Sequence, residues 1–139
     1  MRNWPNGACC NVRLLIDSHT LIWWYVHDQR LSQAARAALL DQGNEILVSP
    51  VCAWEIATKH RLGKWPEAMA LIADFSALLD ADGFRRLPVN ETHALRAGRY
   101  VVPHGDPFDR MLAAQCELED LTLVTRDPAF GEFGCRTLW

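Results

Sequence analysis

The chain has 139 residues, of which 50% are hydrophobic and 22% charged, a balance typical of one folded domain with its own core. A formal net charge of −3 argues against a protein that binds nucleic acid through overall positive charge. No apolar run approaches the roughly 18 residues of a membrane helix, and the start, MRNWPNGACCNVR, lacks the apolar segment of a signal peptide. Five cysteines without metal-ligand spacing suit reduced thiols. We therefore expect a cytoplasmic domain with no membrane partner.

The first half of the chain alternates short apolar runs with helical patterns. Ser32 and Ser49 are residue types that cap helices, and Pro50 occupies the favoured first helical position. Gly43 and Gly63 are expected to end the helices that precede them. The elements expected here are a strand at 12–16, a helix at 18–28, a helix at 33–42, a strand at 45–49 and a helix at 50–62.

The second half continues the alternation, and no two-residue hairpin turn joins any of its strands. Pro66, Asn90 and Asp106 followed by Pro107 mark helix starts, and Gly83 marks a stop. The elements expected here are a helix at 66–82, a weaker strand at 84–89, a helix at 91–100, a helix at 108–119, a strand at 121–125 and a run at 135–139 that could add a fifth strand. Strands that alternate with helices indicate an α/β fold with a parallel sheet covered on both faces.

Four acids fall where parallel sheets form their sites, beyond the carboxyl ends of strands. Asp17 directly follows the first strand, and Glu55 lies in the second turn of the helix after the second strand. Asp109 lies in the first turn of its helix, and Asp127 follows the strand that ends at Thr125. Four distant segments thus bring an acid to one edge of the sheet.

Each acid also has a purely structural interpretation, and the sequence leaves both open. The structural roles are helix capping for Asp17, Asp106 and Asp109, turn formation for Asp127, and an i,i+4 ion pair with Lys59 for Glu55. In the helix at 50–62, Val51, Trp54, Ala57 and Thr58 are taken to mark the packed side. Glu55 is therefore expected to border the core.

Clustered carboxylates repel each other, and burial adds to the cost unless a cation compensates. Oxygen ligands without histidine or thiolate favour Mg²⁺, with Mn²⁺ as a substitute, over zinc. Such an ion at a group of carboxylates assists phosphoryl chemistry by neutralising phosphate oxygens and activating water. An acidic site is therefore compatible with a polyanionic substrate.

Four segments carry a resemblance to a known family: LLIDSHTLIWW, SPVCAWEIATKHRLGK, HGDPFDRMLAAQ and LTLVTRDPAF. They resemble the signature segments of PIN-domain ribonucleases and, within that family, of the VapC toxins of bacterial toxin–antitoxin pairs. The resemblance runs from about residue 12 to residue 139. It implies a PIN-like three-layer α/β/α fold around a mainly parallel sheet of four or five strands. Residues 1–11 precede the resemblance and are expected to be a dispensable extension of a PIN domain at 12–139.

The resemblance also implies the site. The catalytic and metal-binding acids of the family fall on Asp17, Glu55, Asp109 and Asp127. Thr125 matches the small polar residue beside the last acid, Asp106 matches a further acid of the VapC branch, and Lys59 is expected to bind substrate or support the acids. His19 occupies a variable position, is expected to be structural and is left out of the site.

The function implied is that of a Mg²⁺-dependent endoribonuclease that cuts RNA, is neutralised by a VapB-type antitoxin and forms a homodimer. Two alternatives remain. A non-catalytic PIN-like binding module would be expected to have lost one of the acids. A phosphatase of the haloacid dehalogenase type would need a second aspartate where LLIDSHTL has His19, and so lacks its general acid.

Overall fold

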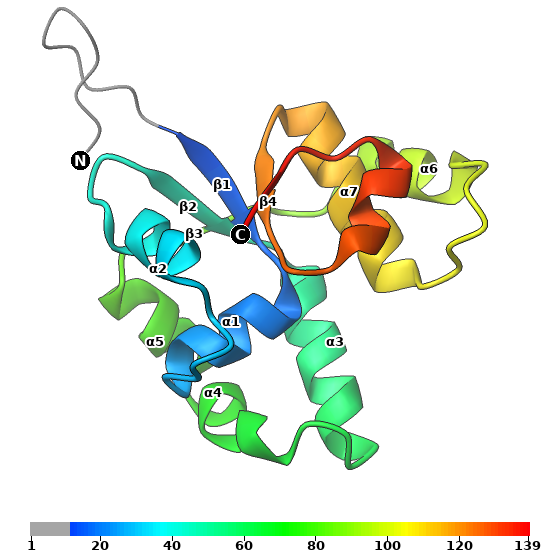
Figure 1. Cartoon of the computed structure of the whole chain (residues 1–139). Coiled ribbons are helices and arrows are strands. Elements are labelled where there is room, and N and C mark those ends of the chain that lie inside the picture. Colours follow the sequence, from blue (N-terminus) through cyan, green and yellow to red (C-terminus); the bar gives the residue numbers. More distant parts are fainter. Residues whose placement is uncertain (1–11) are drawn as a thin grey trace, which may run out of the picture.

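The computed structural model describes residues 12–139, and their centre is a five-stranded sheet in the order β3-β2-β1-β4-β5 (Figure 1). All neighbouring strands pair in parallel; Leu15 of β1, for example, pairs with Leu47 of β2 and Leu123 of β4. The strands are β1 (Arg13–Ile16), β2 (Glu45–Val48), β3 (Arg85–Arg86), β4 (Thr122–Val124) and β5 (Thr137–Leu138). The predicted parallel α/β sheet is confirmed, with five strands. The predicted extension, residues 1–11, lies outside the described residues.

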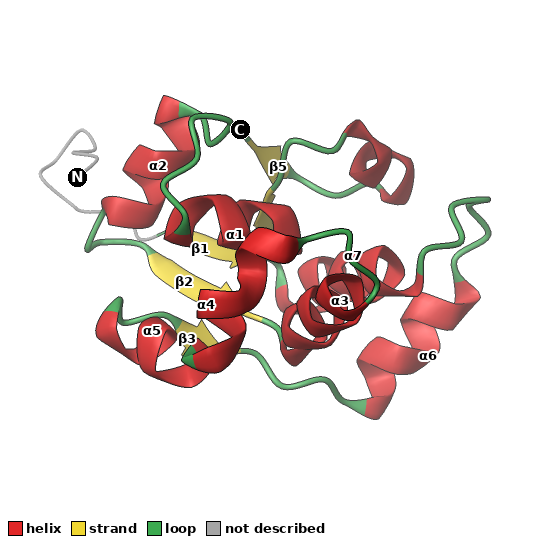
Figure 2. Ribbon diagram, turned by 90° about the horizontal axis from the view of Figure 1, so that it is seen from below, coloured by secondary structure: helices red, strands yellow, loops and turns green. Residues whose placement is uncertain are grey.

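Helices cover both sides of this sheet. In Figures 1 and 2, α1, α2, α4 and α5 gather on one side, and α6 and α7 lie together on the other. Between them, α3 contacts both α1 and α7. The helices are α1 (Ser18–Tyr25), α2 (Gln33–Leu40), α3 (Pro50–Arg61), α4 (Met69–Ala73), α5 (Phe75–Ala81), α6 (Glu91–Arg99) and α7 (Pro107–Glu119), with short 3-10 helices η1 (Pro66–Ala68) and η2 (Pro128–Phe133). None of those in residues 12–139 is long and apolar enough to cross a membrane.

Helix starts and stops follow the local chemistry that the sequence indicates. The Ser32 hydroxyl accepts a hydrogen bond from the Ala35 amide at 3.0 Å, and Ser49 caps α3 through its hydroxyl in the same way. Gly63 and Gly83 both adopt positive φ, at 77° and 70°, so each can turn the chain sharply after a helix without a Cβ clash.

Several predicted elements were too long, and three of them show why. The first helix stops at Tyr25 instead of residue 28, because the chain turns through His27 in the left-handed region at φ 55°. The helix predicted at 66–82 is broken into η1, α4 and α5, with Asp74 outside helical geometry at φ −124° and ψ 31°. Aspartate competes for backbone hydrogen bonds and so favours such a break. The strand predicted at 84–89 pairs only over Arg85–Arg86.

The core lies around the central strand. Leu14, Leu15 and Ile16 of β1 are fully buried, as are Leu123 and Val124 of β4. Because side chains on consecutive residues point to opposite faces, a strand buried at every position must be covered on both faces. The residues that follow β1 and β4 are thus held at fixed positions by a rigid, closely packed centre.

Candidate active site

All four predicted acids border a single hollow at the carboxyl ends of β1 and β4. The hollow has a volume of about 250 Å³, and we call it the acid pocket. Its lining residues are Asp17, Ser18, His19, Glu55, Lys59, His104, Asp106, Asp109, Asp127 and Phe130. The sheet topology therefore brings together the acids from four separate segments, and the predicted supporting residues Asp106 and Lys59 line the same hollow.

Asp17 stands at the end of β1 and is 7% exposed. Its Oδ1 accepts a hydrogen bond from the Thr20 amide at 2.8 Å, which caps α1, and its Oδ2 accepts one from the Thr125 hydroxyl. The Thr125 oxygen in turn accepts a hydrogen bond from the Asp127 amide at 3.1 Å. Burial raises the pKa of Asp17, and the hydrogen bonds from Thr125 and Thr20 oppose that rise. Thr125 thus ties the first acid to the last.

Glu55 is 4% exposed, and its Oε2 lies 2.5 Å from the Lys59 ammonium nitrogen. The same ammonium group lies 4.7 Å from the centre of the Trp65 ring. Lys59 therefore bridges a buried carboxylate and an aromatic face, and it supplies the positive charge that a buried carboxylate needs. The i,i+4 ion pair that the sequence offered as the structural role of Glu55 is present, and it lies inside the acid pocket.

The predicted packed side of α3 was wrong by about one residue. The buried residues are Val51, Cys52, Glu55 and Ile56, whereas Trp54 is 61% exposed and meets Phe108 edge to face at 4.7 Å between ring centres. α3 packs against α1, α4, η1 and α7, so its buried stripe is set by those helices. Glu55 is consequently buried within the packed stripe and not at its border.

Asp106 and Asp109 share the start of α7. Asp106 Oδ1 accepts hydrogen bonds from the amides of Phe108 at 2.8 Å and Asp109 at 3.3 Å, so it is the helix cap. Asp109 Oδ2 lies 2.8 Å from His104 Nε2. Burial raises the pKa of Asp109 to about 6, with the charges of Asp106 and Glu55 acting in the same direction and the His104 hydrogen bond opposing them. The hydrogen bond to Asp109 in turn raises the pKa of His104.

Asp127 opens η2 and is the most open of the predicted acids. The Oδ1 atom of Asp127 accepts a hydrogen bond from the Ala129 amide at 2.9 Å, and Asp127 is exposed to solvent. Capping and site formation are therefore not alternatives in this chain. Asp17, Asp106 and Asp127 each use an oxygen to fix a backbone amide, and that hydrogen bond holds the carboxylate at the acid pocket.

The chemistry of the donors fits a hard cation. One carboxylate oxygen each from Glu55, Asp106 and Asp109 lie within 4.8 Å of one another, the one such group found in residues 12–139. Oxygen donors of this kind suit Mg²⁺ or Mn²⁺. Asp17 and Asp127 line the same hollow but stand outside this tight group, and both oxygens of Asp17 are already hydrogen-bonded. The structure thus places Asp106, predicted only as a supporting residue, in one tight group with Glu55 and Asp109.

Two histidines of the acid pocket were missed or set aside. His104 has no signal in the sequence beyond its place five residues before Asp109, because its contact depends on the loop between α6 and α7 turning back. His19, expected to be structural, is exposed, lines the acid pocket and stacks on Trp23 with 5.3 Å between ring centres. Its position directly after Ser18 at the start of α1 was the available signal.

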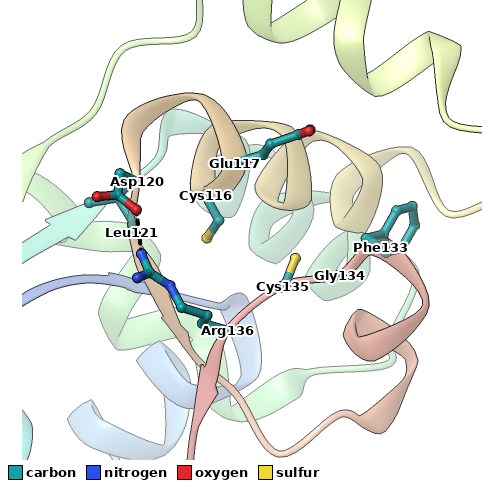
Figure 3. Close-up of a pocket in the computed structure, with 8 residues that line it drawn as sticks. All are labelled: Cys116, Glu117, Asp120, Leu121, Phe133, Gly134, Cys135 and Arg136. Atoms are coloured by element: carbon teal, nitrogen blue, oxygen red, sulfur yellow. Dashed lines mark hydrogen bonds and ion pairs between the residues drawn. The ribbon is translucent and has the colours of Figure 1, made fainter.

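Another hollow lies between α7 and the segment that leads into β5, and it contains none of the predicted site residues (Figure 3). Cys116 and Cys135 point toward each other there, and Arg136 pairs with Asp120 at 2.6 Å. Both cysteines are free thiols, and burial raises the pKa of Cys135 to about 11 and that of Cys116 further. Protonated thiols are poor nucleophiles, so this hollow offers no comparable chemistry.

Comparisons with known proteins agree with this arrangement. Ribonuclease VapC22 of Mycobacterium tuberculosis is 29% identical over 117 residues, which cover 82% of this chain and 86% of the relative. The structure resembles that of VapBC-1 from nontypeable Haemophilus influenzae, with a TM-score of 0.63 and 15% identity over 91% of this chain and 97% of the other. It also resembles that of VapBC2 from Rickettsia felis bound to a promoter DNA fragment, with a TM-score of 0.62 and 12% identity over 91% and 98%.

At such identities the two solved structures show a likeness of fold. The sequence model of the PIN domain matches residues 14–134, a span that includes every residue of the acid pocket. With that match over most of its length and a parallel sheet that gathers acids at one edge, this chain belongs to the PIN domain family.

Proposed function

We propose that this chain is a Mg²⁺-dependent endoribonuclease and the toxin of a type II toxin–antitoxin pair. The observation that carries the proposal is the acid pocket, in which five carboxylates from four separate segments meet at the end of a parallel sheet. Its likeness to a protein named as a VapC ribonuclease supports the reaction. The VapBC structures that share its fold support a setting beside an antitoxin.

Asp17, Glu55, Asp109 and Asp127 hold the cation, and Asp106, whose carboxylate lies close to those of Glu55 and Asp109, supports them. When bound, Mg²⁺ would neutralise phosphate oxygens and activate a water molecule for attack on the phosphodiester. Lys59 fixes one oxygen of Glu55, and His104 fixes one oxygen of Asp109, so each of these carboxylates keeps a single orientation toward the pocket. Thr125 does the same for Asp17. Such fixed orientation of ligands is what their supporting hydrogen bonds supply.

We further propose the partners and the boundaries of the working protein. The antitoxin would be a small VapB-type protein, and the chain would act as a homodimer in the cytoplasm, where the free thiols of Cys52, Cys116 and Cys135 are stable. The PIN domain would comprise residues 12–139, in keeping with the family match at 14–134, and residues 1–11 would be dispensable.

The alternative of a non-catalytic binding module has no support in the acid pocket, because every predicted acid is present there. A phosphatase remains the weaker alternative, since His19 stands where such an enzyme would carry its second aspartate.

The deciding experiment incubates purified protein with a single-stranded oligoribonucleotide in Mg²⁺ and in chelator. Cleavage is expected in Mg²⁺ and not in chelator. The products should carry 5′-phosphate and 3′-hydroxyl ends, because water and not the ribose 2′-hydroxyl attacks. The Asp109→Asn variant should lose nearly all cleavage. A cooperative melting transition in chelator serves as the control that this variant is folded. Products with 2′,3′-cyclic phosphate ends would overturn the mechanism, and hydrolysis of phosphate monoesters without RNA cleavage would favour the phosphatase.

A further inference from the structure

A second hollow, of about 370 Å³, adjoins the acid pocket and differs from it in charge. Its lining residues are Asp17, His19, Trp23, Arg30, Arg126, Asp127 and Pro128, and we call it the arginine pocket. It shares Asp17, His19 and Asp127 with the acid pocket, so a ligand could pass from one to the other without leaving the surface. The proposed cleavage makes no use of its two guanidinium groups.

These guanidinium groups are held in place by one aromatic ring. The central carbons of Arg30 and Arg126 lie 5.0 and 5.2 Å from the centre of the Trp23 indole, which is only 5% exposed. Each such cation–π contact attracts the guanidinium group to the face of the indole ring and favours one position for it. Long side chains that are already ordered lose less conformational entropy when they bind a ligand. The arginine pocket is therefore a pre-arranged pair of cations.

The two arginines are not equivalent. Arg30 forms a two-pronged ion pair with Asp28, at 3.0 Å through Nε and 2.7 Å through Nη2, so much of its charge is already balanced. Arg126 is exposed and forms no salt bridge within residues 12–139; the charge of Asp28 acts on it only from a greater distance. It lines the arginine pocket together with Asp17, His19 and Asp127, which also line the acid pocket, so its charge lies beside the acid pocket. A negatively charged ligand would meet Arg126 first.

We infer that the arginine pocket binds the phosphodiester next to the one that is cleaved, with Arg126 as its main donor and Arg30 as its second. This inference rests on the proposed ribonuclease activity. Guanidinium groups bind phosphate through two parallel hydrogen bonds, and they do so better than ammonium groups. The exposed ring of His19, which contacts Trp23 and also lies 4.6 Å from Trp65, gives an adjacent base a surface for stacking. Cations interleaved with aromatic rings are typical of single-stranded nucleic acid grooves.

The first test measures binding. A fluorescein-labelled single-stranded oligoribonucleotide is titrated in Mg²⁺ with the Asp109→Asn protein, and fluorescence anisotropy is read at several salt concentrations. The same titration is repeated with four double variants, which combine Asp109→Asn with Arg126→Ala, Arg126→Lys, Arg30→Ala or Arg99→Ala. Arg99 is an exposed arginine of α6 outside both pockets and serves as the control. Arg126→Ala should weaken binding roughly tenfold, as expected for a lost charge-assisted hydrogen bond, and lower the salt slope by about 0.7. Arg126→Lys and Arg30→Ala should have smaller effects, and Arg99→Ala none.

The second test locates the phosphate. Single-turnover cleavage by the unmodified chain and by Arg126→Ala is compared on an oligoribonucleotide and on versions with an uncharged methylphosphonate on either side of the cleaved bond. On one side of the cleaved bond, the neutral linkage should lower the cleavage rate of the unmodified chain roughly tenfold. The same linkage should lower the rate of Arg126→Ala hardly any further. The neutral linkage and Arg126→Ala could instead lower the rate independently, so that their effects multiply whichever side of the cleaved bond carries the linkage. In that case Arg126 does not contact a neighbouring phosphate, and the inference is wrong.

The two proposals fail separately. If the unmodified chain does not cut RNA, the proposed function fails and with it the position next to a cleaved bond, whereas the binding test still decides whether the arginine pocket binds an RNA phosphate. Equal RNA binding by the Arg126, Arg30 and Arg99 variants overturns the inference even if cleavage is observed. In that case the guanidinium groups are free to take a carboxylate of a protein partner.

Discussion

The hydroxyl group of Thr125 donates a hydrogen bond to the carboxylate of Asp17, 108 residues earlier in the chain, and both side chains are buried. Thr125→Val keeps the shape of the side chain but removes this donor. The variant leaves Asp17 Oδ2 without a partner, so we expect the free energy of unfolding in chelator at pH 8 to fall by about 1–3 kcal/mol. Thr125→Ser keeps the hydroxyl and should lose much less. Urea unfolding of the three proteins checks this, and equal losses in Val and Ser variants would contradict it.

The ion pair of Lys59 with Glu55 predicts a partial rescue. Lys59→Met keeps the aliphatic stem against Trp65 but leaves a buried carboxylate unpaired, which should cost about 1–3 kcal/mol of the free energy of unfolding. Adding Glu55→Gln removes the unpaired charge, so the double variant should be more stable than Lys59→Met alone. Mg²⁺ should also stabilise Lys59→Met more than the unmodified chain, because the ion takes over the neutralisation of Glu55. Denaturant titrations with and without Mg²⁺ measure both effects; a double variant less stable than Lys59→Met would refute the ion-pair argument.

Substitutions of Asp109 and of Asp106 should differ in how much RNA cleavage they abolish. Asp109→Asn removes a proposed ligand whose pKa is raised by burial, and we expect RNA cleavage to fall by roughly 1000-fold. Asparagine caps helices nearly as well as aspartate, so Asp106→Asn should keep α7 intact and retain activity within roughly 10–100-fold. Cleavage rates at increasing Mg²⁺ concentrations, with melting temperatures as a folding control, distinguish the two. Complete loss in both variants would make Asp106 a ligand of equal rank.

The repulsion among the carboxylates should be visible in thermal unfolding. Mg²⁺ at a hundredfold excess over its dissociation constant stabilises a folded state by about 2.7 kcal/mol, which for a domain of this size corresponds to roughly 9 °C. Asp17→Asn removes one buried charge, so its melting temperature in chelator should rise while most of the Mg²⁺ effect disappears. The matched control is Asp120→Asn, at an exposed carboxylate outside the acid pocket, which should keep the full Mg²⁺ effect. Were Asp17 only a helix cap, both variants would respond to Mg²⁺ alike.

The raised pKa of Asp109 sets a pH dependence with a definite sign. Above its ordinary pKa of 3.8, the unfolded chain releases this proton, while the folded chain keeps it until about pH 6. The contribution of Asp109 to stability is therefore highest below about pH 4 and is lost as pH rises to about 6. Asp109→Asn does not titrate, so its stability relative to the unmodified chain should rise between pH 4.5 and pH 7 in chelator. An unchanged difference between those two pH values would show that Asp109 titrates normally.

Much of the fold could be predicted because its signals are local. Ser49 with Pro50 and Asp106 with Pro107 fix helix starts through a hydroxyl or carboxylate and one or two amides, and these residues are adjacent in sequence. The break at Asp74 was missed because a single non-helical residue is too weak a signal against a long apolar pattern. The position of each acid after its strand was likewise local, and the parallel sheet alone sufficed to bring the acids to one edge.

Contacts between distant segments could not be read in the same way. Periodicity treated Trp54 as packed, but the buried stripe of α3 depends on where α1 and α7 cross it, and Trp54 points outward against Phe108. His104 reaches Asp109 only because the loop before α7 folds back, and no pattern of residue types encodes that path. The closeness of Asp106 to Glu55 has the same cause: it depends on the packing of α3 against α7.

The strand order determines how late in synthesis the acid pocket can form. β4 pairs with β1, and Asp127 is synthesised 110 residues after Asp17, so a growing chain on the ribosome holds only part of the acid pocket for most of its synthesis. Pairing between segments so far apart is also a slow step in folding. A chain released early, before β4, cannot join its acids at all. Under the proposed function, no nuclease can therefore form until β4 and Asp127 have been synthesised and have folded against β1.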